Sequence, residues 1–186
     1  MTEFITKPLT LDTWPAFAAL VERHNGVWSG CWCIGFHAER ETQGYEVRRE
    51  LKLAKVRLGE TQSALVFAGD TCVGWCQFGP TETLPKIKNR KVYEAGLSAL
   101  PDWRITCFFV DRQWRGKGVA AVALAGALEE IRGLGGGSIE SYPEDVEGRE
   151  TSSSFLHNAT VGMFERLGFA RDRRIGKDRW VVRRTI

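Results

Sequence analysis

The sequence predicts a mixed α/β fold in which helices cover a central sheet. Residues 63–78 hold two β-rich runs around Gly69-Asp70, which is typical of a tight β-hairpin. Residues 103–110, WRITCFFV, are uniformly apolar toward their end and predict a buried strand. A glycine-rich turn then leads into a long alanine- and leucine-rich run, which predicts a helix after that strand. The expected order of elements is β-α-α-β-β-β-α-β-α-β-β.

One strand and two helices are expected before the hairpin. Residues 3–8 alternate weakly between apolar and polar side chains, as a strand does. Thr10 or Asp12 can cap a helix over residues 11–24, whose apolar side chains share one face. Residues 40–59 predict a second helix with a broad apolar stripe among many charges.

The remaining elements surround and follow the buried strand. Residues 79–102 predict a long irregular connection with three prolines, and connections of this length are usually functional or mobile. Three glycines, 135–137, end the helix that follows the glycine-rich turn. Further along we expect a short strand over 138–142, a polar loop over 143–153, a helix over 154–167, and a terminal strand pair that turns at Gly176-Lys177.

Length and composition indicate a single domain spanning residues 1–186. Hydrophobic residues make up 43% of the 186 and charged residues 26%, which is ordinary for a globular domain with a core. A net charge of +3 is too small to indicate nucleic acid as a partner. The sequence has no apolar run that could cross a membrane and no signal peptide, so we expect a cytoplasmic protein without a membrane partner.

The five cysteines are an odd number and lie in apolar surroundings. They predict reduced, buried thiols rather than a disulfide framework. Cys31 and Cys33, with His24 and His37 nearby, invite comparison with a zinc site. Zinc sites usually separate their first two cysteines by about two to four residues and add a second pair of ligands. This pair is closer together and has no second pair, so we expect no metal.

The turn between the buried strand and the next helix has the composition of an anion site. The first N–H groups of a helix lack internal partners, and the helix dipole adds positive potential there. Gly116 and Gly118 carry no Cβ atoms to keep a phosphate away, while Arg115 and Lys117 add positive charge. The alternative is a tight turn whose glycines serve packing alone. The spacing matches neither a nucleotide P-loop nor the G-x-G-x-x-G dinucleotide loop.

Residues 115–120, RGKGVA, match the R/Q-x-x-G-x-G/A signature of the GNAT superfamily of acyl-CoA-dependent N-acyltransferases. Residues 163–174, MFERLGFARDRR, resemble the end of the family's late helix and the start of its last strands. The resemblance is specific over residues 103–186, and the segments CWCIGF, VGWCQFGP and ESYP resemble a poorly characterised bacterial branch. It implies the GNAT fold, a central, mostly antiparallel sheet with splayed central strands, flanked by helices.

The resemblance also implies an N-acetyltransferase that moves an acetyl group from acetyl-CoA to a primary amine by direct attack. In the family the pantetheine arm lies between the splayed strands, so main-chain groups of Phe108, Phe109 and Val110 would meet it. A backbone N–H near Val110 would stabilise the oxyanion of the tetrahedral intermediate. The pyrophosphate would be held by Arg115, Gly116, Lys117, Gly118, Val119 and Ala120.

Two positions depart from the family's pattern. His157 stands where the family often has a cofactor-contacting asparagine, with Asn158 one residue later, and we expect both near the cofactor. Phe164 stands where the family often has a tyrosine that protonates the departing thiolate, and phenylalanine cannot donate a proton. Glu140 and Tyr142 are our candidates for the base and the acid, because two-residue spacing places them on one face of a strand. The alternatives are a surface carboxylate and a packing residue.

The acceptor side is expected among aromatic residues. Trp28, Trp32 and Trp75 either line the acceptor pocket or belong to the core. The acceptor would be a small-molecule or peptide amine that the sequence does not specify, and a homodimer is one expected state because dimers are frequent in the family. Two other functions stay open. One is a non-catalytic CoA-binding sensor of the same fold, which Phe164 favours, and the other is an interaction protein that uses only the fold.

Overall fold

The structure of the protein, a computed structural model, describes residues 3–148 and 156–186. Its strands are β1 (Phe4–Pro8), β2 (Gln62–Ala68), β3 (Thr71–Pro80), β4 (Trp103–Val110), β5 (Ser138–Ser141), β6 (Ala170–Arg174) and β7 (Trp180–Thr185). Its helices are α1 (Trp14–Glu22), α2 (Tyr45–Leu58), α3 (Arg90–Ala95), α4 (Val119–Gly133) and α5 (Val161–Arg166), and a short 3₁₀ turn spans Arg112–Trp114. None of these helices, in the part of the chain described, has the length and apolar character needed to cross a bilayer.

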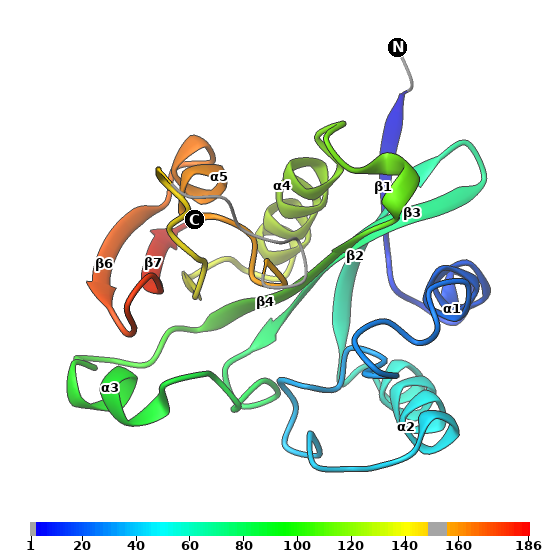
Figure 1. Ribbon diagram of the computed structural model, residues 1–186, viewed down its shortest axis with the longest axis horizontal. Coiled ribbons are helices and arrows are strands. Elements are labelled where there is room, and N and C mark those ends of the chain that lie inside the picture. Colours follow the sequence, from blue (N-terminus) through cyan, green and yellow to red (C-terminus); the bar gives the residue numbers. More distant parts are fainter. Residues whose placement is uncertain (1–2, 149–155) are drawn as a thin grey trace.

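The seven strands of the described residues form one sheet in the order β1-β2-β3-β4-β5-β7-β6 (Figure 1). Neighbouring strands are antiparallel except β4 and β5, which are parallel. Helices α4 and α5 pack on one side of the sheet, and α1 and α2 lie on the other side (Figure 1). The mixed α/β class and the mostly antiparallel sheet flanked by helices are therefore confirmed.

Strand β4 contributes to both hydrophobic cores, because successive side chains of a strand point to opposite faces. Phe108 packs in the core beneath α4 and α5, together with Leu124 and Phe164. Phe109 packs in the other core, beneath α1, together with Trp75. The end of β4 is thus held from both sides, which fixes the course of its backbone.

Strands β4 and β5 separate partway along β4. Their ladder pairs Trp103–Ile105 with Ile139–Ser141 only, although β4 continues to Val110. Opposite β3, β4 carries one extra residue between Ile105 and Phe108, where the register between the two strands shifts. A bulge of this kind bends the strand and increases its twist. The splayed central strands that the family resemblance implies are therefore present.

The hairpin lies where the sequence predicts it, but the first helix is shorter than expected. Gly69 begins the two-residue turn between β2 and β3 with φ +58°, in the left-handed region that glycine tolerates. Helix α1 begins at Trp14, and the residue before it is Thr13 rather than Thr10 or Asp12. The Thr13 hydroxyl donates a 2.7 Å hydrogen bond to the last carbonyl of β1 instead of capping the helix.

The second helix and the connection after the hairpin also differ from the expected boundaries. Helix α2 begins at Tyr45 rather than at residue 40, because Gly44 has φ +93°, far from helical values. The connection expected over 79–102 contains the end of β3 and helix α3, so it is less irregular than its three prolines suggest.

The last helix, expected over 154–167, begins later than predicted. Helix α5 starts at Val161, where the Thr160 hydroxyl accepts a hydrogen bond from the Met163 N–H. Residues 156–160 precede it without helical structure. Residues 154 and 155, and the end of the predicted polar loop, lie outside the described residues.

Candidate active site

The loop before α4, residues 115–118, has a backbone that depends on glycine. Gly116 has φ +73° and Gly118 has φ +82°, values that side-chain-bearing residues rarely adopt. A Cβ atom at either position would meet nothing within 4 Å beyond its chain neighbours, so packing does not require glycine there. The first helical bonds run from the N–H groups of Ala121 and Val122 to the Gly118 carbonyl oxygen, at 3.0 and 3.1 Å. The N–H groups of the preceding turn lie outside the helical ladder, the arrangement that binds anions.

Two cationic residues, Arg115 and Lys117, belong to this loop. Arg115 Nε donates to the Val110 carbonyl oxygen at 3.4 Å, which ties the loop to the end of β4. Lys117 Nζ lies 4.6 Å from the centre of the Trp114 ring. Both side chains are exposed, and their charges add to the positive potential of the helix N-terminus. Open space around the glycines and the two cations favour an anion site over the packing alternative.

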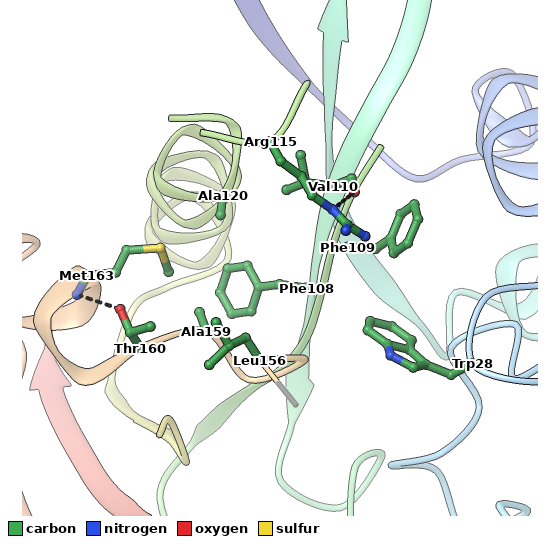
Figure 2. Close-up of a pocket in the computed structure, with 10 residues that line it drawn as sticks. All are labelled: Trp28, Phe108, Phe109, Val110, Arg115, Ala120, Leu156, Ala159, Thr160 and Met163. Atoms are coloured by element: carbon green, nitrogen blue, oxygen red, sulfur yellow. Dashed lines mark hydrogen bonds between the residues drawn. The ribbon is translucent and has the colours of Figure 1, made fainter. Parts of the chain in front are cut away.

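A cavity of about 260 Å³, here called the first cavity, lies between this loop, the end of β4 and the segment leading into α5 (Figure 2). In Figure 2, Phe108 points toward Ala120 and Met163, and Phe109 points to the opposite side of the strand. The lining is mostly apolar and consists of Trp28, Phe108, Phe109, Val110, Arg115, Ala120, Leu156, Ala159, Thr160 and Met163. The cavity thus suits a ligand with an anionic end and a less polar arm.

Beyond Ile105 a gap separates β4 from β5, and fewer main-chain groups of β4 face this gap than the family resemblance implies. The Phe108 N–H donates to the His157 carbonyl oxygen at 2.7 Å, and the Asp111 N–H donates to a β3 carbonyl at 2.9 Å. Main-chain groups of successive strand residues point to opposite sides. The Phe109 main chain, expected at the cofactor, therefore faces β3, with which Phe109 is paired. The Val110 N–H faces the gap.

Asn158 braces the splayed strands. It is buried, its Nδ2 donates to the Thr106 carbonyl oxygen, and its Oδ1 accepts a 3.0 Å hydrogen bond from Arg179 Nη1. The amide continues the contacts of β4 beyond Ile105, where the ladder with β5 ends. Asn158 is not among the residues that line the first cavity. The structure thus gives Asn158 a bracing role, and its expected contact with the cofactor stays a prediction.

His157 lies at the border between the first cavity and a second cavity of about 370 Å³. Its ring centre is 6.0 Å from that of Trp28, which lines both cavities, and 6.2 Å from that of Phe36. Burial, with the positive charges of Lys88 and Arg179, lowers the pKa of His157 to about 4, so its imidazole is neutral near pH 7. The second cavity is lined by Trp28, Cys31, Cys33, Gly35, Phe36, Arg40, Lys86, Ile87, Lys88, Cys107 and His157.

The three tryptophans expected at the acceptor site separate into two groups. Trp28 lines both cavities. Trp32 and Trp75 are 0% and 1% exposed and pack around Phe17 in the core. Trp75 supports the site from behind, since its ring centre lies 4.9 Å from that of Phe109. For Trp32 and Trp75 the structure favours the core alternative.

Glu140 and Tyr142 share a face at the end of β5, as their spacing predicts, but neither is among the residues lining the two cavities. Glu140 is fully buried, and its Oε2 accepts hydrogen bonds from Tyr93 Oη at 2.8 Å and Tyr142 Oη at 3.2 Å. Its Oε1 accepts from Arg183 Nε at 2.6 Å. Burial raises the pKa of Tyr142 well above its ordinary value. Their assignment as base and acid stays a prediction that this geometry does not favour.

Phe164 is a core residue of α5. It is fully buried, and its ring packs edge-on against Phe108 and Phe169, with ring centres 5.9 and 5.0 Å away. The position that often carries a proton donor in the family therefore packs the core here.

A buried polar cluster that the sequence analysis did not find adjoins the second cavity. Lys52 of α2 is fully buried, and its Nζ donates to the Thr61 hydroxyl at 2.7 Å. Cys33 is 3% exposed, and its Sγ is hydrogen-bonded to Gln77 Oε1. Burial raises the pKa of the Cys33 thiol, but a hydrogen bond with Cys107 and the charge of Lys52 outweigh this effect and lower it. These residues come from segments that are distant in sequence, so their spacing does not indicate that they form a cluster.

The cysteines are free, and four of the five are buried, as the sequence predicts. Cys31 is partly exposed at the second cavity. Within residues 3–148 and 156–186, no three His, Cys, Asp or Glu side chains are grouped so that they could hold a metal ion.

Comparison with known proteins places the chain in a family. The acetyltransferase (GNAT) family model matches residues 32–169. A GNAT-family protein from Desulfovibrio desulfuricans has a similar structure, with a TM-score of 0.59 and 17% identity over 98% of this chain and 99% of that one. The PaiA N-acetyltransferase from Thermoplasma acidophilum, in complex with coenzyme A, gives a TM-score of 0.56 and 13% identity over 99% of each chain. Ribosomal-protein-alanine N-acetyltransferase from Brucella melitensis gives a TM-score of 0.55 and 16% identity over 98% of this chain and 99% of that one.

The family match covers most of the chain, so this protein belongs to the GNAT acetyltransferase family. The resemblance carried by residues 115–120 and 163–174 is confirmed, and the class of protein is an acyltransferase whose family typically uses acetyl-CoA. At the identities found, the structural neighbours establish the fold alone. No curated protein matches the sequence significantly.

Proposed function

We propose that this protein transfers the acetyl group of acetyl-CoA to a primary amine by direct attack. One arrangement carries the proposal: the first cavity joins the glycine loop before α4 to the splayed end of β4. The loop suits a pyrophosphate, and the gap beside β4 suits an extended arm that pairs with backbone groups as a strand would.

Acetyl-CoA supplies an acyl thioester when it is bound, and residues of this chain would hold and polarise it. The Val110 N–H is the donor that we assign to the thioester oxygen, because the alternation of β4 directs it into the gap. Negative charge on that oxygen grows in the transition state. Removing one such donor typically lowers the rate about 10²–10³-fold.

We assign His157 as the group that accepts the proton of the attacking amine, in place of Glu140. Its imidazole is neutral near pH 7 and lies at the border of the two cavities. With a pKa of about 4 it is a weak base in the free protein, and negative charge bound near Lys88 would strengthen it. The thiolate departs without an acid at Phe164, and the ordinary thiol pKa of about 8.5 makes it a fair leaving group.

An amine panel with acetyl-CoA tests this function. Acetylated product and free CoA are measured by mass spectrometry, because thiol reagents would also react with the five cysteines of the protein. Thermal unfolding is followed in parallel with and without acetyl-CoA. We expect a raised Tm and acetylated product from at least one amine.

Two other outcomes identify the alternatives. A raised Tm without product from any amine supports the non-catalytic CoA-binding sensor. Neither a raised Tm nor product supports an interaction protein that uses only the fold.

A further inference from the structure

The second cavity neighbours the first one. Trp28 lines both, and the second cavity extends from there to residues 86–88 of the connection after β3. Near the border its wall is aromatic, because Trp28 and Phe36 flank the His157 ring. A volume of about 370 Å³ is that of a small-molecule site.

The charge of this cavity is positive. Among the described residues that line it, each charged side chain is a cation, namely Arg40, Lys86 and Lys88. Lys86 is half-buried, and Arg40 and Lys88 are exposed at the rim. Burial, with the charges of Arg179 and Arg40, lowers the pKa of Lys88, as expected where positive charges are close together. The extra ammonium group of a polyamine would therefore meet repulsion here.

The carboxylates near these cations have partners of their own. The negative charge of Glu144 partly opposes the lowering of the Lys88 pKa. Glu144 also accepts an ion-pair hydrogen bond from Arg179. Glu41 pairs with Arg40 at 3.1 Å, but its side chain is 83% exposed, so solvent screens that pair. Among the described residues, positive charge therefore dominates the cavity.

The geometry points to an acceptor that carries a carboxylate and an apolar or aromatic body beside its amine, as a free apolar amino acid does; this rests on the proposed function. The carboxylate would face Lys86 and Lys88. The apolar body would lie against the Trp28 and Phe36 rings, with the amine at the border with the first cavity.

A carboxylate in this position also acts on His157. Beyond burial, the charges of Lys88 and Arg179 lower the pKa of His157. A bound carboxylate offsets the Lys88 charge and raises the pKa of His157 toward its ordinary value of about 6.5, where general bases work best near neutral pH. A cationic group would lower it further. The carboxylate that favours binding of the acceptor would thus also make His157 a stronger base.

Matched acceptor pairs test the inference: L-phenylalanine against 2-phenylethylamine, L-leucine against 3-methylbutylamine, and L-tryptophan against tryptamine. The members of each pair share the amine and the apolar body and differ by the carboxylate. We expect kcat/KM to be at least about tenfold higher for the amino acid in one or more pairs. Equal or higher values for the decarboxylated amines in all pairs would overturn the inference and leave the proposed function standing.

The remaining outcomes are also decisive. Product from a polyamine or from a peptide with the same N-terminal residue, but from none of the amino acids, would overturn the inference alone. No product from any amine would contradict the proposed function itself.

A variant that removes one positive charge tests whether the preference for a carboxylate depends on the second cavity. Lys88→Met keeps an unbranched side chain of nearly the same length without the charge, and it should narrow the kcat/KM ratio between amino acid and matching amine about tenfold, chiefly through KM for the amino acid. Lys91→Met is the matched control, because Lys91 is an exposed lysine of α3 that does not line the cavity. An unchanged ratio in Lys88→Met would contradict the assigned contact.

Discussion

The backbone N–H of Phe108 donates a 2.7 Å hydrogen bond to the carbonyl oxygen of His157, beyond the point where β5 has parted from β4. This bond holds the main chain of residue 157 against β4, while the imidazole lines the second cavity. Because the bond uses only backbone atoms, a side-chain substitution at residue 157 leaves it in place. The chemistry of the imidazole can therefore be tested apart from the fold.

His157→Gln should lower kcat about 10²-fold or more, the usual effect of losing a general base. The Kd of acetyl-CoA should change by less than about twofold, because the ring lines the second cavity rather than the first. Steady-state kinetics and calorimetry measure the two quantities. A loss of acetyl-CoA affinity that parallels the loss of turnover would instead make His157 the cofactor contact that the family resemblance implies.

Gly118→Val should abolish acetyl-CoA binding. A side chain here would project into the open space that we assign to the pyrophosphate, and the residue must also keep φ +82°. Titration calorimetry with acetyl-CoA measures the effect.

Gly59→Val is the matched control for this change. Gly59 also has positive φ, +70°, and open space around a Cβ atom, but it follows α2, far along the chain from the loop. Both variants should lose similar stability to backbone strain, and only Gly118→Val should lose binding. Unchanged affinity in Gly118→Val would count against the pyrophosphate site.

The strand and the glycine-rich loop that we assign to the cofactor could be located from the sequence because they are contiguous. The strand over 103–110 is followed closely by residues 115–120, so local pattern and spacing place the strand and the loop next to each other. The same reasoning could not show which way each β4 backbone group points. The bulge before Phe108 and the hydrogen bond to His157 decide that, and both depend on partners distant in sequence.

The second cavity, which we assign to the acceptor, could not be predicted because it is assembled from separate segments. Arg40, Lys86, Lys88 and His157 meet around one cavity only in the folded chain. The two-residue spacing of Glu140 and Tyr142 correctly predicted that they share a face. It could not reveal the other partners of the Glu140 carboxylate, Tyr93 of α3 and Arg183 of β7, because these are distant in sequence.

Glu140→Gln should reduce stability more than catalysis. Glutamine can still accept from Tyr93 and Tyr142, but it removes the buried charge that pairs with Arg183, whose guanidinium keeps the longer contact with Asp172 at 3.8 Å. We expect the free energy of unfolding to fall by about 1–3 kcal/mol in urea titrations, with kcat/KM within about threefold of the parent protein.

Glu129→Gln provides the comparison, because Glu129 forms an exposed ion pair with Arg132 on α4. Its loss should change stability by less than about 1 kcal/mol. A large loss of turnover in Glu140→Gln at unchanged stability would restore Glu140 as the general base.

Stability should fall in acid because His37 is buried without a charge. Its exposure is 1%, and burial, with the charges of Lys52 and Lys55, lowers its pKa to about 2. The unfolded chain takes up this proton below about pH 6.5, whereas the folded protein does not. The stability that His37 contributes is therefore present above that pH and is lost as the pH falls toward about 2.

His37→Gln isolates this effect, since glutamine offers an acceptor in place of the ring nitrogen that lies 2.9 Å from Gln77 Nε2 but does not titrate in this range. Urea unfolding at pH 7 and pH 5 gives the free energy of unfolding of both proteins. The parent protein should lose about 2 kcal/mol more than the variant over this interval, because a single group with these two pKa values loses that much. His24 and His157 are present in both proteins, so their contributions cancel in the difference. Equal losses would mean that His37 takes up its proton as readily in the folded protein as in the unfolded chain.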